Sequence, residues 1–208
     1  MQSKILILAL ALAVTGGFYA PAEGAGKKGE NQAYWQQQKQ ERHQHRQQMR
    51  EKNKAFRETL KDMSPEERTK AMAEFAEARF QQNVTFNAQQ YQENLALLKS
   101  KLAENQRLTD AQKAEIIAFF EQQHRENADF NAKRHAENMA FMQQVNNDTS
   151  LTPEQRRQKI KEHRQAAAAE RKARQEQQQA ARKALWEKMG LEKECGKQAG
   201  QQAKQDDK

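Results

Sequence analysis

The sequence predicts an all-α protein of long antiparallel helices, with helical hairpin repeats of about 44 residues, extended rather than globular. Three observations support this prediction. The chain has only 3 Pro and 8 Gly and is otherwise rich in the helix formers Gln, Glu, Lys, Arg and Ala. The pattern Ser/Thr-x-x-Glu/Gln, which caps helix N-termini, occurs at Ser64, Thr109 and Thr152. Its copies are 45 and 43 residues apart, which indicates a helical repeat.

The first 22 residues do not belong to that repeat. Lys4 precedes an apolar run at 5–14, and Ala20-Pro21-Ala22 is a small-x-small cleavage signature. This order is typical of a secretory signal peptide, and the run is short for a membrane span. We therefore predict that residues 1–22 are a signal peptide. The mature protein is then expected in the periplasm, with no stable membrane insertion after cleavage.

Composition and helix breakers divide the rest of the chain. Residues 23–32 are rich in Gly and Lys and are predicted to be a disordered linker. A helical repeat domain follows at 33–189, and Gly190 can end its last helix. Residues 190–208 form a polar tail that we expect to be disordered. Within the repeat domain we place helices at about 33–61, 65–104, 110–145 and 153–189.

The last three helices begin with the same capping box. A Ser or Thr side chain accepts a hydrogen bond from the amide three residues on, and the Glu or Gln there reaches back to the amide of the cap. Proline at the first helical position favours the same start. We therefore assign a helix-capping role to Ser64, Glu67, Leu108, Thr109, Gln112, Leu151, Thr152 and Gln155.

The second and third helices are sequence copies, since Phe86-Asn87-Ala88 returns 44 residues later as Phe130-Asn131-Ala132. The second helix carries a heptad-like apolar stripe, which we predict to be its buried seam. The stripe is Val84, Ala88, Tyr91, Leu95, Leu98 and Leu102, and its copy in the third helix is Ala128, Ala132, His135, Met139, Met142 and Asn146. Because the copy is weaker, we expect an antiparallel homodimer. Two chains would either pair their strong stripes or close the bundle with the Ile116, Phe119 and Phe120 end of the third helix.

Large apolar side chains also lie off the stripe. They either widen the core face of each helix or line an exposed apolar groove, which would be a binding surface. These residues are Phe80, Phe86, Leu97, Phe130 and Phe141.

The charge balance limits the possible partners. The 208-residue chain carries a net charge of +8, which in an exported protein favours acidic proteins or anionic surfaces over nucleic acid. The sequence has no phosphate-binding loop, no useful Cys/His spacing and no serine nucleophile motif, so we predict neither an enzyme nor a cofactor. The single Cys195 is either a free thiol or half of an intermolecular disulfide.

Two of the capping segments carry a family resemblance. Leu108-Thr109-Asp110-Ala111-Gln112 and Leu151-Thr152-Pro153-Glu154-Gln155 resemble the paired LTXXQ motifs of the Spy/CpxP family, over roughly residues 60–165. The resemblance implies a small periplasmic helical protein that forms a curved antiparallel dimer. It also implies an ATP-independent chaperone for unfolded envelope proteins, or a modulator of an envelope-stress sensor.

We accordingly expect a basic, partly apolar helical surface that holds unfolded or misfolded proteins. Phe and Met side chains can adapt to varied client sequences, and positive charge attracts clients over a distance. The candidate client-binding residues are Phe80, Phe86, Phe130, Met139, Phe141, Met142, Arg79, Arg125 and Arg134.

Two other functions stay open. A metal-responsive periplasmic protein, binding zinc, copper or nickel, is suggested by the five His and by metal-binding relatives of the family. His43 and His45 point to different sides of a helix, and His124 and His135 are three turns apart, so we assign no metal ligand. A site assembled across helices or across a dimer is the remaining possibility. The other alternative is a structural coiled-coil assembly protein, suggested by the repeat.

Overall fold

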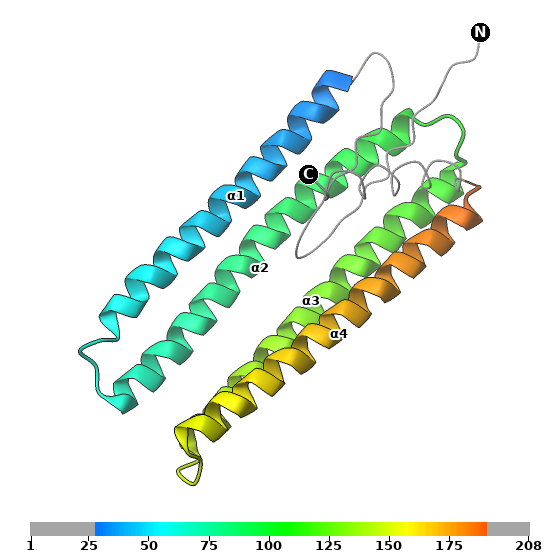
Figure 1. Ribbon diagram of the computed structural model, residues 1–208. Helices are drawn as coiled ribbons and strands as arrows, with labels where there is room; N and C mark the ends of the chain where they lie inside the picture. The colour runs from blue at the N-terminus through cyan, green and yellow to red at the C-terminus, as the bar shows by residue number, and fades with distance from the viewer. Residues whose placement is uncertain (1–27, 191–208) are drawn as a thin grey trace, which may run out of the picture. The chain divides into compact units, whose positions relative to one another are not determined.

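The computed structural model describes residues 28–190, which form four α-helices joined by short turns (Figure 1). The helices are α1 (Lys28–Thr59), α2 (Pro65–Glu104), α3 (Asp110–Asn147) and α4 (Pro153–Lys188). No strand occurs among these residues, so the all-α prediction is confirmed. None of the helices in this range has a segment long and apolar enough to cross a membrane.

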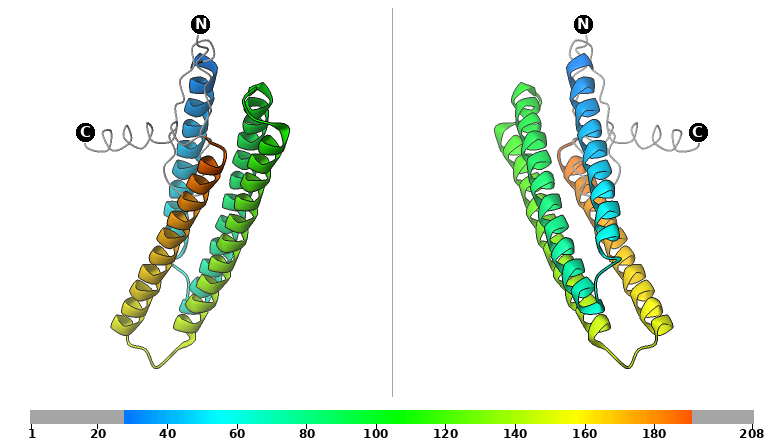
Figure 2. Two further views of the ribbon diagram at one scale, coloured as in Figure 1. Left: turned by 90° about the vertical axis from the view of Figure 1, so that its right-hand side faces the viewer. Right: turned by 90° about the vertical axis from the view of Figure 1, so that its left-hand side faces the viewer.

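The helical region divides into two compact units, one ending at Leu108 and the other starting at Thr109. The described part of the first is the hairpin α1–α2, and that of the second is the hairpin α3–α4. Figure 2 shows the turn from α3 to α4 from two further directions. The predicted signal peptide, and the tail from residue 191 with Cys195, lie outside the described residues.

One predicted boundary is wrong. Helix α1 begins at Lys28, so residues 28–32 are helical rather than part of a disordered linker. The segment contains one Gly, which costs about 1 kcal/mol in a helix, but Glu30 and Gln32 are good helix formers. The helix therefore continues through a segment whose Gly and Lys content indicated a break.

The helix starts have the predicted capping geometry. The amide N of Glu67, Gln112 and Gln155 lies 3.3, 3.2 and 3.2 Å from the hydroxyl oxygen of its cap. Each N3 side chain in turn accepts from the cap amide, at 2.8 Å for Ser64, 2.9 Å for Thr109 and 2.8 Å for Thr152. The hydrogen bonds from Ser64 hold the pKa of Glu67 below its usual range.

An arginine ties each hairpin turn to the helix that follows it. Arg68 donates to the backbone oxygen of Lys61 at 2.8 Å, and Arg156 donates to that of Asp148 at 2.7 Å. The two arginines are 88 residues apart, which is two periods of the sequence repeat. The 44-residue period is thus one helix with its connection, and one hairpin spans two periods.

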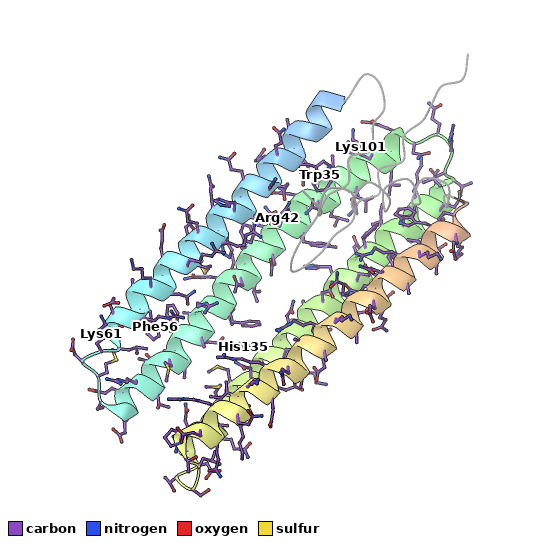
Figure 3. All side chains as sticks on the ribbon, viewed as in Figure 1. Trp35, Arg42, Phe56, Lys61, Lys101 and His135 are labelled. Carbon is purple, nitrogen blue, oxygen red and sulfur yellow. The ribbon has the colours of Figure 1, made fainter. Side chains whose placement is uncertain are left out.

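The α1–α2 hairpin is held by a ladder of polar side chains. These contacts join positions of α2 that recur at intervals of three, four or seven residues, with two adjacent pairs, and so lie along one face of the helix. Arg42 and Phe56 point from α1 toward α2 (Figure 3). The hydrogen-bonded pairs are Tyr34–Asn94 (3.0 Å), Gln38–Glu93 (2.5 Å), Glu41–Gln90 (2.7 Å), His45–Asn83 (2.9 Å), Lys52–Gln82 (3.1 Å) and Asn53–Arg79 (2.9 Å).

The α3–α4 hairpin instead has an apolar cluster at its open end. Ile116 and Phe120 are fully buried, and Phe120 contacts the ring of Trp186 with centroids 6.5 Å apart. Leu185 on α4 and Met189 at the C-terminal cap of that helix are also buried. Ion pairs flank this seam, including Arg174–Glu126 at 2.9 Å and Arg134–Glu170 at 2.9 Å.

The predicted apolar seam is only partly correct. On α2 the last four stripe positions, from Tyr91 to Leu102, are buried, but Val84 is 43% exposed and Ala88 is exposed. On α3 none of the six stripe positions is buried, and the buried residues are Ile116, Phe120, Gln123 and Val145. The reason is that α3 packs on α4 with the face that carries Asn127, Arg134 and Phe141, and the copied stripe falls on another face.

Candidate functional site

The six predicted apolar contact residues are all half-buried. They are Phe80, Phe86, Phe130, Met139, Phe141 and Met142. A helix in a two-helix hairpin has one neighbour within that hairpin, which covers only part of a wide apolar face. These side chains therefore keep some surface exposed while they touch other residues.

Three of the aromatic rings contact a basic side chain across their hairpin. Phe86 stacks on His45 with ring centroids 4.1 Å apart and planes 2° apart. Phe141 stacks on His163 at 4.0 Å and 6°. The guanidinium of Arg174 lies 6.0 Å from the centroid of Phe130, within the range of a cation–π contact. Each ring thus has one covered face.

Two of the three predicted arginines serve helix packing. Arg79 donates to Asn53 at 2.9 Å and lies 5.9 Å from the ring centroid of Phe75. Arg134 is only 16% exposed and pairs with carboxylates on both α3 and α4. Arg125 is exposed. Arg79 and Arg134 are therefore tied within their hairpins, and Arg125 has the exposure expected of a surface contact.

A basic row on α4 was missed in the sequence analysis. Arg157, Lys161 and Arg164 are exposed, follow one another in steps of four and three, and form no ion pair with the described residues. They line an open groove of about 510 Å³ together with Ile160, Gln165 and Ala168. We call Arg157, Lys161 and Arg164 the basic row. The sequence signal for it was three cations spaced by four and three residues. None of them has an Asp or Glu three or four residues after it in the chain.

The histidines do not come together. Within residues 28–190, no group of three or more His, Cys, Asp or Glu side chains is placed to hold a metal ion. His45 and His163 are stacked on phenylalanines, as above, and His43 is exposed. Burial, with Arg125 nearby, holds the pKa of His124 below its usual range, which favours the neutral ring.

Comparison with known proteins gives no family assignment. No protein-family model, curated protein or solved structure matches the chain. The resemblance to the Spy/CpxP family therefore stays a prediction that rests on the two LTXXQ-like segments.

Proposed function

We propose that the protein is an ATP-independent periplasmic chaperone, or a stress-related binding protein, that holds unfolded envelope proteins on a basic, partly apolar helical surface. One observation carries the proposal. In the half of the α3–α4 hairpin next to its turn, half-exposed apolar side chains accompany the unpaired basic row. Phe141 of α3 stacks on His163 of α4, so the two helices lie side by side at this level. Met142 follows Phe141 on α3, and Arg164 follows His163 on α4, so both lie close to this level of the hairpin.

The chemistry of this region suits a client without a fixed structure. Unpaired cations at the surface attract acidic segments over roughly a Debye length, about 10 Å at 0.1 M salt. Met142 and Ile160 are half-exposed and offer apolar contact without a preformed deep pocket. Methionine is flexible and polarizable, so it can pack against many different side chains.

The test is suppression of client aggregation without ATP, at low and high salt, using an acidic and a basic unfolded client. We expect suppression at substoichiometric to equimolar chaperone, and faster capture of the acidic client at low salt. No suppression of either client at any salt would end the proposal.

A charge-matched pair of variants shows whether the basic row is responsible. The first replaces the row, as Arg157→Gln, Lys161→Gln and Arg164→Gln. The control removes three lysines that are already ion-paired, as Lys133→Gln, Lys172→Gln and Lys183→Gln. Both lose the same charge, so we expect slower capture only in the first. Equal slowing in both would mean that net charge acts, and not the row.

The location and assembly belong to the same proposal. If the protein is exported, cell fractionation should find it in the periplasm, with its N-terminus shortened by removal of the signal peptide. The predicted homodimer is checked by light scattering of that mature chain. An intact N-terminus on the protein in the cytoplasm would remove the periplasmic part of the proposal.

A further inference from the structure

Helix α1 contributes few buried apolar side chains to its contact with α2. Among the described side chains of α1, residues 33–59, only Gln38 and Met49 are buried. Gln38 is 1% exposed, yet its Oε1 atom has no hydrogen-bond partner. The Nε2 atom of the same side chain donates a 2.5 Å hydrogen bond to Glu93. A buried polar group that is only half satisfied weakens the packing that it belongs to.

The hydrogen bonds between α1 and α2 can be exchanged for water at little net change in free energy. They join polar side chains, several of which are exposed, such as Lys52 and Gln82. Folded hydrogen bonds of this kind replace bonds to water and contribute only a small net stabilisation each. Apolar burial stabilises most helix pairs, and α1 itself contributes little of it to this seam, since Met49 is its one buried apolar side chain among residues 33–59.

Helix α4 is held differently. Leu185, Trp186 and Met189 are each 7% exposed, and Phe120 on α3 is fully buried. Moving α4 away from α3 would expose this cluster to water. Local opening follows the elements with the fewest buried apolar contacts. Within the two described hairpins, α1 is therefore the helix that opens most easily.

The face of α2 beneath α1 carries aromatic side chains that would add a second apolar surface to the one proposed on α3–α4. Phe75 is covered by the ring of Phe56, with centroids 3.9 Å apart, and Phe86 is covered by His45. Phe75 and Phe86 are eleven residues apart, three turns along the same face. With α1 removed, both rings would face solvent between polar side chains.

We infer that α1 is a displaceable helix, which covers the aromatic face of α2 at rest and uncovers Phe75 and Phe86 for a client. The contact between α1 and α2 is thus autoinhibitory. This inference rests on the proposed function for its meaning, but the opening itself is a property of the hairpin. A client segment replaces α1 on the same face, so opening and client binding are coupled.

Hydrogen exchange of the full chain tests the opening. Amides in the middle of α1 are expected to exchange together, and about tenfold or more faster than those of α4 around Leu185. Exchange of α1 as slow as that of α4 would overturn the inference.

A covalent link tests whether opening is required. Lys52→Cys and Gln82→Cys, in a Cys195→Ser background, are joined by a short bismaleimide, because the parent side chains are exposed and 3.1 Å apart. The control joins Glu115→Cys to Lys188→Cys, an exposed contact across α3 and α4. We expect the first link to reduce hydrophobic-dye binding and aggregation suppression about fivefold or more, and the control link to change neither.

The outcomes separate the two proposals. Equal dye binding and equal suppression with and without the 52–82 link overturn the displaceable helix. If the unlinked protein suppresses no aggregation, but α1 opens and the link abolishes dye binding, the chaperone function fails and the displaceable helix stands.

Discussion

His45 of α1 lies flat on Phe86 of α2, with ring centroids 4.1 Å apart, and its Nε2 atom hydrogen-bonds Oδ1 of Asn83 at 2.9 Å. The other hairpin has a corresponding stack between Phe141 and His163. One imidazole–phenyl stack in each hairpin links a helix pair at a position where neither residue is fully buried. An aromatic pair of this kind contributes about 0.5–1.5 kcal/mol beyond its burial.

Replacing His45 should loosen the first hairpin. His45→Ala removes the stack and the hydrogen bond to Asn83, so we expect the free energy of unfolding to fall by about 1–2 kcal/mol. The measurement is urea unfolding followed by the fluorescence of Trp35, with Trp186→Phe in the background. His43→Ala is the control, since His43 is exposed two residues away, and it should change stability by less than about 0.5 kcal/mol. Equal losses in the two variants would contradict the role of the stack.

The capping boxes should contribute stability locally. Thr152→Ala removes the hydroxyl that accepts from the amide of Gln155 at 3.2 Å. The expected loss is about 1 kcal/mol, and Thr152→Ser should retain most of the stability because it keeps the oxygen. Trp186 fluorescence during urea unfolding, with Trp35→Phe in the background, reports on this hairpin. Thr149→Ala, in the preceding turn, is the control, and a loss there as large as at Thr152 would mean that the box has no special role.

The apolar cluster should be the main stabilising element of the second hairpin. Phe120→Ala leaves a cavity at a fully buried site, so we expect a loss of about 3–5 kcal/mol in the unfolding of α3–α4. Met72→Ala is the control, because that side chain is 41% exposed and its loss should change stability little. Circular dichroism during thermal unfolding would measure both. A small effect of Phe120→Ala would show that the site collapses around the missing ring.

Local chemistry explains which parts of this fold the sequence could predict. The helix starts at Pro65, Asp110 and Pro153 depend on residues within four positions of each cap, and the structure places them as expected. The face with which each helix packs on its neighbour was harder to predict, because the stripe rule assumes that apolar side chains form the contact between two helices. Here α1 pairs with α2 through Asn83 and Gln90, and amide pairings leave no hydrophobic period in the sequence.

The sequence predicted only part of the candidate site, again because contacts between helices are not visible in the local pattern. Phe86 and Phe141 were identified because large apolar residues off a stripe need a partner or stay exposed. The stacking histidines were judged only as metal ligands, so their contacts with these rings were not expected. The basic row was visible as a spacing of three cations, but its lack of ion pairs depends on where the carboxylates of other helices lie.

Alkaline pH should release α1 through Tyr34. Burial, with the carboxylates of Glu93 and Glu41 nearby, raises the pKa of Tyr34 to about 12, from 10 in a free side chain. Since the folded-state pKa is raised, the stabilisation is fully present below pH 10 and is lost as the pH rises through 12. Stability should therefore fall more steeply with pH in the parent than in Tyr34→Phe, as measured by urea unfolding between pH 9 and 12. Lysines titrate equally in both proteins, so parallel profiles would contradict the shift.

Gln38→Met should strengthen the α1–α2 hairpin. Methionine has a similar length and removes the buried Oε1 atom that has no hydrogen-bond partner. Glu93 keeps the 2.9 Å hydrogen bond that it accepts from Gln89, so the substitution does not strand its carboxylate. We expect the free energy of unfolding to rise by about 1 kcal/mol, and hydrogen exchange in α1 to slow about fivefold.

The same substitution at the preceding residue, Gln37→Met, is the control for Gln38→Met. Gln37 is exposed and bonds only the next turn of its own helix, at Glu41, so Gln37→Met should change stability by less than about 0.5 kcal/mol. Faster exchange of α1 in Gln38→Met would mean that the hydrogen bond to Glu93 stabilises the hairpin by more than the unpaired oxygen weakens it. Slower exchange with reduced hydrophobic-dye binding would connect the polar seam of α1 directly to exposure of the aromatic face of α2.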